Sequence, residues 1–409
     1  MGKEKLPDGW KILPISKCIV DDLSGFACSQ TKLVTENGYV QLRPFNIESG
    51  KLNLDTLYQV PLDIVDDKKY YLEIGDILFN NTNSTELVGK SAIAEDRYPF
   101  AFSNHINRIR VDSNVVLPKF FHNYLFYMWT KGHFAKHCKK WIGQSGYTLT
   151  NLKQQLIPIP PLDVQQEIVA KIGKQMVEIE IMKKGSEKSI EHSEKYYSSY
   201  LNSFFDDLCK DESTLVTLND VCEIRSGQVD PKLEELKKFP HIYGKSIESG
   251  TGRLLEYNTI GEDEVTSGKY LFKAGDVLYS KLRPYLKKVI YADFDGLCSA
   301  DMYPLEVDRT KINPHWLVML LLSNDFTSYA IHQSSRARMP KLNRTQLNSW
   351  KFSLPPLYIQ KTQVEQFHEV IEIINEIRDF AQFQFEAIDQ LSESILNDVF
   401  GKYEIPEKV

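Results

Sequence analysis

The sequence predicts an α+β protein in which two tandem, homologous globular domains are separated by a long antiparallel pair of helices resembling a coiled coil. Two observations predict this fold. Segments of the first half return in the second half in the same order, and each half ends in a long stretch whose apolar residues recur every three or four positions. The predicted domains are residues 1–160 and 211–355, and the predicted helical segments are residues 161–210 and 356–409.

The repeat is visible in three pairs of segments. Ile47-Glu48-Ser49-Gly50 returns as Ile247-Glu248-Ser249-Gly250, a shift of 247 − 47 = 200. The run 75–79 returns as 275–279 at the same shift, and Pro160-Pro161-Leu162 returns as Pro355-Pro356-Leu357 at a shift of 195. A duplicated scaffold without a shared function is one interpretation of this pattern. We favour a duplicated binding module, because duplicating a module normally duplicates its binding mode.

Each half begins with short β-rich runs and turn residues, which are typical of a compact α+β domain. After each double proline the apolar pattern becomes helical, and each segment of about 40 residues would be roughly 60 Å long. The buried positions predicted in the first helix are Ile168, Ile172, Met176, Ile179, Met182, Ile190, Tyr197, Leu201, Phe204 and Leu208. Those in the second are Val364, Phe367, Ile371, Ile374, Ala381, Phe385, Ile388, Ile395 and Val399. Ordinary core packing is the alternative, but no other segment is long enough to cover both helices.

Composition limits the class of protein. The longest apolar run, Leu317–Leu322, is too short to span a bilayer, and no apolar signal segment follows the N-terminus, so we expect a cytoplasmic protein. Six cysteines without a CxxC pair predict reduced thiols, mostly buried. The net charge of −6 argues weakly against nucleic-acid binding, but the acidic residues gather in the two helical segments and leave basic clusters elsewhere.

No catalytic motif is recognisable in the sequence. A phosphate-binding loop and an Asn-Pro-Pro-Tyr/Phe methyltransferase motif are both absent. The nuclease-like fragment Glu235-Leu236-Lys237 near Asp230 fits solvated surface better. His133 and His137 with Cys138 lack a third ligand, so we predict no metal and no cofactor in this chain.

Basic and polar segments interleaved with aromatic residues are suited to holding phosphates and reading base edges. The DNA-binding candidates in the first half are Asn81, Asn83, Asn104, Arg108, Gln144, Ser145 and Tyr147. Those in the second half are Lys281, Arg283, Tyr285, Lys287, Arg336, Arg338, Lys341 and Asn343. The halves share a frame but not these residues, as two unlike half-sites would require.

The chain resembles a specificity subunit of a type I restriction-modification system over essentially its whole length. The resemblance rests on Leu6-Pro7-Asp8-Gly9-Trp10, on the Gly-Asp segments at 75–78 and 275–278, and on Lys281-Leu282-Arg283-Pro284-Tyr285. It rests also on the double prolines followed by Gln165 and Gln360. Each motif is short, but their order and duplication make the combination specific.

The resemblance implies two target-recognition domains and two spacer helices that dock modification subunits. It also implies that S-adenosylmethionine, ATP and Mg belong to partners: two methyltransferase subunits that flip out and methylate adenine, and ATP-dependent restriction subunits that translocate and cleave DNA. Gln360 is followed by Lys361-Thr362 where Gln165 is followed by Gln166-Glu167, so the two docking surfaces differ. A fused restriction enzyme and a duplicated binder of RNA or glycan are the competing classes, and the recognised bases cannot be derived from the sequence.

Overall fold

The computed structural model describes residues 5–62, 68–205, 215–334 and 339–403. The chain divides into two compact units. Unit 1 comprises Met1–Gly185 with Gln384–Val409, and unit 2 comprises Ser186–Phe383. Each unit therefore contains one globular domain and parts of both long helices, and the division falls within the helices rather than at the ends of the globular domains.

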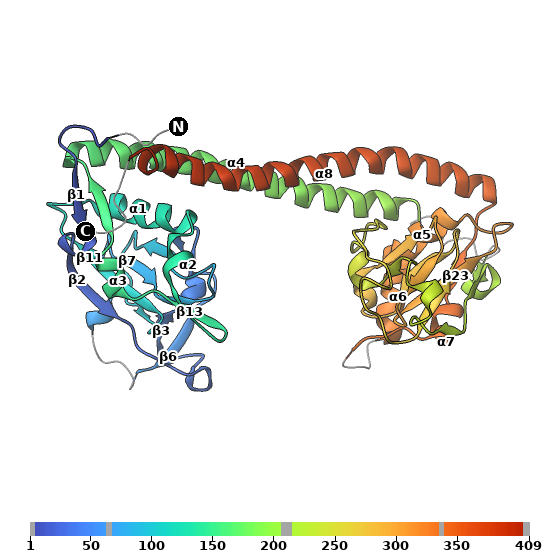
Figure 1. Cartoon of the computed structure of the whole chain (residues 1–409). Helices are drawn as coiled ribbons and strands as arrows, with labels where there is room; N and C mark the ends of the chain where they lie inside the picture. The colour runs from blue at the N-terminus through green and yellow to red at the C-terminus, as the bar shows by residue number, and fades with distance from the viewer. Residues whose placement is uncertain (1–4, 63–67, 206–214, 335–338, 404–409) are drawn as a thin grey trace. The chain divides into compact units, whose positions relative to one another are not determined.

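The globular domain of unit 1 is built around a four-stranded antiparallel sheet (Figure 1). Its strands in spatial order are β2 (Ile19–Ser24), β11 (Ile106–Val111), β7 (Ile77–Asn80) and β9 (Ser91–Ile93). A three-stranded sheet contains β10 (Ala101–Phe102), β3 (Gly38–Leu42) and β6 (Tyr58–Pro61). Short pairs are formed by β1 (Lys11–Pro14) with β14 (Leu156–Ile159) and by β4 (Ile47–Glu48) with β5 (Lys51–Leu52). The helices are α1 (Pro118–Thr130), α2 (His133–His137) and α3 (Leu149–Lys153).

Unit 2 repeats the four-stranded sheet and the terminal strand pair of unit 1, while its second sheet has four strands in place of three. Its four-stranded sheet has the order β16 (Cys222–Ile224), β23 (Met302–Val307), β20 (Val277–Ser280) and β21 (Val289–Tyr291). The second sheet contains β17 (Gln228–Val229), β19 (Lys269–Phe272), β22 (Gly296–Cys298) and β18 (His241–Ile242), and β15 (Leu215–Thr217) pairs with β24 (Lys351–Ser353). The helices are α5 (Pro314–Leu322), α6 (Asn324–Ser334) and α7 (Arg344–Asn348). The corresponding strand orders establish the duplication in three dimensions.

The two long helices are α4 (Leu162–Ser203) and α8 (Leu357–Phe400). In unit 1, Ile172 near the start of α4 shares a buried cluster with Leu396 and Phe400 at the end of α8. In unit 2, Tyr197 near the end of α4 packs on Phe367 near the start of α8, with ring centroids 5.8 Å apart. Early residues of one helix thus meet late residues of the other, which confirms the predicted antiparallel pairing within each unit.

The buried stripe of the helices differs in part from the prediction. Ile172 and Ile179 are buried as predicted, but Met182 is exposed, and the seven-residue spacing continues through the buried Ser186 and Ser193. In α8 the fully buried residues at the end are Leu396 and Phe400, one position after the predicted Ile395 and Val399. The sequence pattern favoured large apolar residues, whereas closely packed helices also accept serine. Leu208 lies outside the described residues.

A buried glutamine joins the start of each long helix to its globular domain. The Gln165 Oε1 accepts a hydrogen bond from the backbone N–H of Leu117 at 2.8 Å, and its Nε2 donates to the carbonyls of Val115 and Pro160 at 3.1 and 2.9 Å. In unit 2 the Gln360 Oε1 accepts from Asn313 N–H at 2.7 Å, and its Nε2 donates to Lys311 and Pro355 at 3.1 and 2.7 Å. The orientation of each helix base on its domain is therefore fixed by the same three bonds.

The sequence also predicts that no segment spans a bilayer and that the cysteines are reduced thiols. Among the described residues no helix is long and apolar enough to cross a membrane. The described cysteines (Cys18, Cys28, Cys138, Cys222 and Cys298) are free. Burial raises the pKa of Cys18 to about 11 and that of Cys222 to about 12, so both remain protonated thiols.

Gln165→Leu is expected to lower the free energy of unfolding by about 3 kcal/mol, because it leaves a buried N–H and two carbonyls without a partner. Urea denaturation measures the change. The matched control is Gln166→Leu, whose side chain is exposed at the next position and which should change stability by less than about 0.5 kcal/mol. Equal effects of the two substitutions would contradict the role of the buried amide.

Candidate nucleic-acid interface

Three segments that are distant in the sequence meet at one edge of the domain in unit 1. The strand β8 (Thr82–Asn83) follows β7 and pairs with β13 (Gln144–Gly146), which pairs in turn with β12 (Lys139–Trp141). The loop between β10 and β11 joins them, since the amide Nδ2 of Asn81 donates to the carbonyl of Asn104 at 3.1 Å and to Asn107 Oδ1 at 2.7 Å. The structure thus brings the candidates Asn81, Asn83, Asn104 and Gln144 together.

The same frame, meaning the two backbone hydrogen bonds made by the residue after the third strand of the sheet, is present in unit 2. In unit 1, Asn81 N–H donates to the His105 carbonyl at 2.9 Å, and the Asn81 carbonyl accepts from Tyr147 N–H at 2.8 Å. In unit 2, Lys281 N–H donates to the Asp301 carbonyl at 3.0 Å, and the Lys281 carbonyl accepts from Leu342 N–H at 2.9 Å. Asn81 and Lys281 therefore occupy equivalent backbone positions with different side chains.

The candidates of unit 2 form a basic group around this frame. Arg283 and Tyr285 are exposed, and Arg283 and Lys287 both adopt positive φ angles, 52° and 47°. Lys287 Nζ donates to Asn324 Oδ1 at 2.8 Å, and burial lowers the Lys287 pKa. Arg336 and Arg338 lie outside the described residues.

Two lysines of the same group already have partners. Lys281 is buried with its ammonium 4.7 Å from the centroid of the Tyr303 ring, and desolvation lowers its pKa. Lys341 is exposed and pairs with Asp301 at 3.0 Å.

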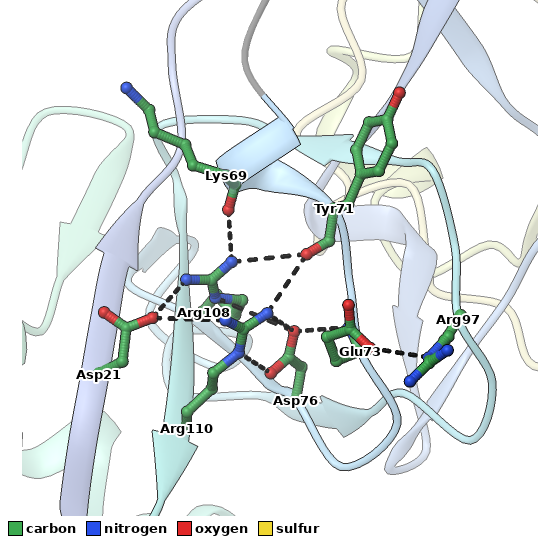
Figure 2. Close-up of polar contacts among 8 residues, drawn as sticks. All are labelled: Asp21, Lys69, Tyr71, Glu73, Asp76, Arg97, Arg108 and Arg110. Carbon is green, nitrogen blue, oxygen red and sulfur yellow. Dashed lines mark hydrogen bonds and ion pairs between the residues drawn. The ribbon is translucent and has the colours of Figure 1, made fainter.

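Four candidates have structural roles that the sequence did not reveal. Arg108 is buried, and its guanidinium pairs with Asp21 at 2.6 Å and donates to the Lys69 carbonyl (Figure 2). Ser145 is buried against the Thr85 hydroxyl at 2.8 Å, and the Tyr147 ring is packed in the core beside Phe134. Asn343 caps α7, where its side chain accepts from Gln346 N–H at 2.8 Å. These side chains stabilise the domains. Arg108, Ser145 and Tyr147 are buried, as is Lys281, contrary to the exposed positions expected of residues that read a ligand.

The Gly-Asp segments of the repeat have a structural role as well. The Asp76 carboxylate is buried, accepts from the backbone N–H of Glu73 at 2.8 Å, and receives two bonds from Arg110 at 2.6 and 3.0 Å (Figure 2). Its counterpart Asp276 accepts from Lys273 N–H at 2.9 Å. Both aspartates follow a glycine of positive φ, Gly75 at 91° and Gly275 at 101°.

The arginine that neutralises this aspartate comes from a different strand in each unit. Arg110 is on β11, whereas Asp276 is held by Arg225, which follows β16, at 2.6 and 3.1 Å. The β-sheet registers place Glu306 where unit 1 has Arg110, and Glu306 pairs with Arg225 at 3.1 Å. The buried carboxylate is thus kept while its partner has changed strands.

Sequence reasoning missed a cleft in unit 1 that adjoins the candidate Asn83. It has a volume of about 560 Å³ and is lined in part by Arg43, Tyr58, Asn83 and Lys90. The Arg43 guanidinium lies 5.5 Å from the Tyr58 ring centroid and donates to the carbonyl of Cys28 at 3.1 Å, which fixes its position. The basic-aromatic run Arg43-Pro44-Phe45 was a signal for this cleft, but the amide-rich loops are the more prominent polar feature of the first half. At the 200-residue shift Arg43 corresponds to Tyr243, so this position differs between the halves.

Among the described residues no cluster of three or more His, Cys, Asp or Glu side chains could hold a metal ion. His133 and His137 are instead neighbours in α2, where His137 Nδ1 lies 2.8 Å from the His133 carbonyl.

The duplicated domains with divergent polar loops match a known family. A family model described as "Type I restriction modification DNA specificity domain" matches residues 28–192 and again residues 210–379. The chain therefore belongs to the type I restriction-modification specificity subunits, whose role is DNA recognition rather than catalysis. The family resemblance and the α+β fold class predicted from the sequence are confirmed.

Individual relatives agree with this assignment. The chain is 39% identical over 177 residues to the type I restriction enzyme EcoDI specificity subunit of Escherichia coli, a match covering 42% of this chain and 39% of that protein. It is 24% identical over 413 residues to the putative type I restriction enzyme MjaX specificity subunit of Methanocaldococcus jannaschii, covering 96% of this chain and 93% of the relative.

Solved structures share the fold. A chain from work on complex assembly and conformational transition of the type I R-M system superposes with a TM-score of 0.73 at 18% identity, covering 98% of this chain and 100% of that one. The HsdS subunit from Thermoanaerobacter tengcongensis gives a TM-score of 0.50 at 19% identity, covering 98% of this chain and 99% of that one.

Arg110→Ala is expected to lower the free energy of unfolding by about 3 kcal/mol, because it removes the main partner of a buried carboxylate. Glu306→Ala is the matched control at the equivalent position of unit 2. It leaves Asp276 paired with Arg225 and should cost less than about 1 kcal/mol. Thermal or urea unfolding of the two variants measures both values, and a larger loss for Glu306→Ala would contradict the exchange of partners.

Proposed function

We propose that the two globular domains read the two halves of a bipartite DNA target, separated by a gap of fixed length whose bases are not read. One observation carries this proposal: the two domains share the same backbone hydrogen bonds at one position but present different side chains around it. Asn81 and Lys281 make equivalent backbone bonds, yet the exposed side chains near them differ, since unit 1 presents the amide of Gln144 and unit 2 presents the cation of Arg283. Amides suit adenine and cationic side chains suit guanine or phosphate, so the two domains would prefer different bases.

The long helices supply the surface for partner subunits. In unit 2, α8 exposes Ile373, Ile377, Phe380 and Phe383, whose spacings of four, three and three residues place them near one another on the helix. In unit 1, α4 exposes the smaller group Val177, Ile181 and Met182. Exposed apolar groups of this kind mark interaction surfaces. We propose that each helix docks one modification subunit and that the α8 surface contributes more binding energy.

The chemistry would then belong to the partners. The chain would act in the cytoplasm without a cofactor of its own, while the modification subunits bind S-adenosylmethionine and methylate the target, and the restriction subunits use ATP and Mg to cleave unmodified DNA. The proposed division of labour makes methyl transfer dependent on complex formation.

The full chain alone is expected neither to methylate nor to cut duplex DNA, and methyl transfer should appear when the modification subunit and S-adenosylmethionine are added. The double substitution Ile377→Ser with Phe380→Ser should weaken binding of that subunit about tenfold or more, because it removes two large apolar side chains from the centre of the docking surface. Sedimentation and transfer of labelled methyl groups measure the two effects.

The control is Val20→Ser, which removes an equally exposed apolar side chain from the globular domain of unit 1 and should leave assembly unchanged. Methyl transfer by the isolated chain would contradict the proposed division of labour. Unchanged assembly of the double variant would contradict the docking surface.

The length of the helix pair should set the gap between the half-sites. Insertion of seven residues in both helices, after Gly185 and after Phe383, preserves the seven-residue spacing of buried positions and adds about 10 Å. At 3.4 Å per base pair the gap should grow by about three base pairs while both half-sites stay the same.

Methylation mapping of cells that carry this variant reads the gap directly. As a control, the same seven residues are inserted at the exposed turn Asp96-Arg97, which should leave the gap unchanged. An active helix variant with the original gap would show that the helices do not determine the spacing.

A further inference from the structure

The hairpin of β12 and β13 in unit 1 carries an apolar tip that nothing in the domain covers. Trp141 pairs with Gln144, so Ile142 and Gly143 form the two-residue turn, and Gly143 has a φ of 78°. Ile142 has a relative exposure of 105%, the highest of the large apolar side chains of the described residues, and Trp141 is 53% exposed. Exposing an isoleucine to water at the end of a two-stranded ribbon is unfavourable, which indicates that another molecule covers it.

The tryptophan beside this tip lies against the hairpin itself. A side chain at Gly146 would place its Cβ 2.7 Å from the Trp141 ring. The ring can pack against the backbone of the neighbouring strand because Gly146 has no side chain. The Lys139 ammonium lies 5.9 Å from the centroid of the same ring. The ring therefore stiffens the ribbon, and Ile142 is left as the projecting apolar group.

The surroundings of the tip indicate what it meets. Lys139 and Lys140 are exposed on β12, and Gln144 is exposed on the other side of the turn. The third strand of this small sheet contains Asn83, which is paired with Ser145 and lines the cleft with Arg43 and Lys90. An apolar group flanked by lysines and amides fits a ligand that presents apolar groups between two rows of phosphates. The major groove of DNA is such a ligand, and it is wide enough to admit a two-stranded β-ribbon.

We infer that the β12–β13 hairpin enters the major groove of one half-site and that Ile142 contacts the methyl group of a thymine, making Ile142 a specificity-determining residue. The methyl group is the apolar feature that an A·T pair presents in this groove. Gln144 follows the turn and its amide is exposed. An amide of this kind can form two hydrogen bonds with an adenine. Lys139 and Lys140 would contact phosphates on the groove edge. This inference rests on the proposed function and names one contact within it.

The contact would belong to one half-site only. At the 195-residue shift, positions 141–143 correspond to Arg336, Ala337 and Arg338 in the second half of the sequence. Alanine and arginine at these positions do not reproduce a projecting isoleucine, so the two domains would differ in their sensitivity to thymine methyl groups.

Deoxyuridine substitution tests the contact, because it removes the thymine methyl and leaves base pairing intact. The complex of the full chain with its modification subunit is titrated against the duplex identified by methylation mapping, with each thymine of both half-sites replaced in turn. One replacement is expected to weaken wild-type binding about fourfold, which corresponds to the loss of one buried methyl group. Ile142→Ala should bind the thymine duplex about as weakly as the wild type binds the substituted one, and should no longer distinguish the two duplexes.

Two control variants distinguish the thymine contact from a general loss of DNA affinity. Ile74→Ala removes a similarly exposed isoleucine at 66% exposure elsewhere in unit 1, and it should retain the wild-type response to deoxyuridine. Lys139→Ala with Lys140→Ala should weaken binding to both duplexes equally and flatten the salt dependence. Circular dichroism confirms that the variants are folded.

The outcomes are distinguishable. A wild-type complex that shows no sequence preference at all would defeat the proposed function itself. Specific binding in which no deoxyuridine replacement matters, or in which Ile142→Ala still distinguishes the two duplexes, would overturn only the thymine contact.

Discussion

The arrangement of each unit depends on one buried side chain at the base of each long helix. Gln165 and Gln360 are fully buried amides, and each uses its oxygen and its nitrogen to satisfy three backbone groups. A buried amide in this setting is costly unless all of its bonds are made, so the helix base has one permitted orientation on its domain. The double proline before each glutamine restricts the preceding backbone and begins the helix at the same place.

Because the helix base is fixed on its domain by buried bonds, the side chains of the candidate DNA-binding loops can differ between the units. The loops lie in each domain on a frame of backbone bonds that is the same in both units, as Asn81 and Lys281 illustrate. Side chains on that frame can therefore diverge without disturbing the core. The exchange of Arg110 for Arg225 as the partner of the buried aspartate shows that even a structural ion pair can move between strands when the carboxylate is kept.

The sequence predicted the duplication and the two long helices because these depend on patterns that extend over many residues. It predicted the site less well. Arg108 looks like a DNA contact in the sequence, yet it is buried against Asp21, a residue 87 positions away that no local pattern connects to it. Met182 fits the apolar spacing of the helix interface in the sequence, yet it is exposed. The spacing of apolar residues does not show which of them the partner helix covers.

The opposite error concerns Ile142. An isoleucine in a sequence is usually a core residue, and only the hairpin geometry shows it at an exposed turn between lysine-bearing and amide-bearing strands. Arg43 was missed for a related reason, since its cleft is assembled from four separate segments of the chain. Charge and polarity can be read from the sequence, but convergence in space cannot.

The central claim is that each globular domain reads its own half-site and is held by an equivalent glutamine at the base of its helix. The most direct test replaces residues 6–159 of the full chain with residues 215–354, so that both helices carry the second domain on equivalent buried bonds. Methylation mapping in cells that also produce the modification subunit measures the new target. The account predicts that one original half-site disappears and the other occurs at both ends of an otherwise unchanged gap. Retention of the original target, or the appearance of a new sequence at the end read by the untouched domain, would contradict it.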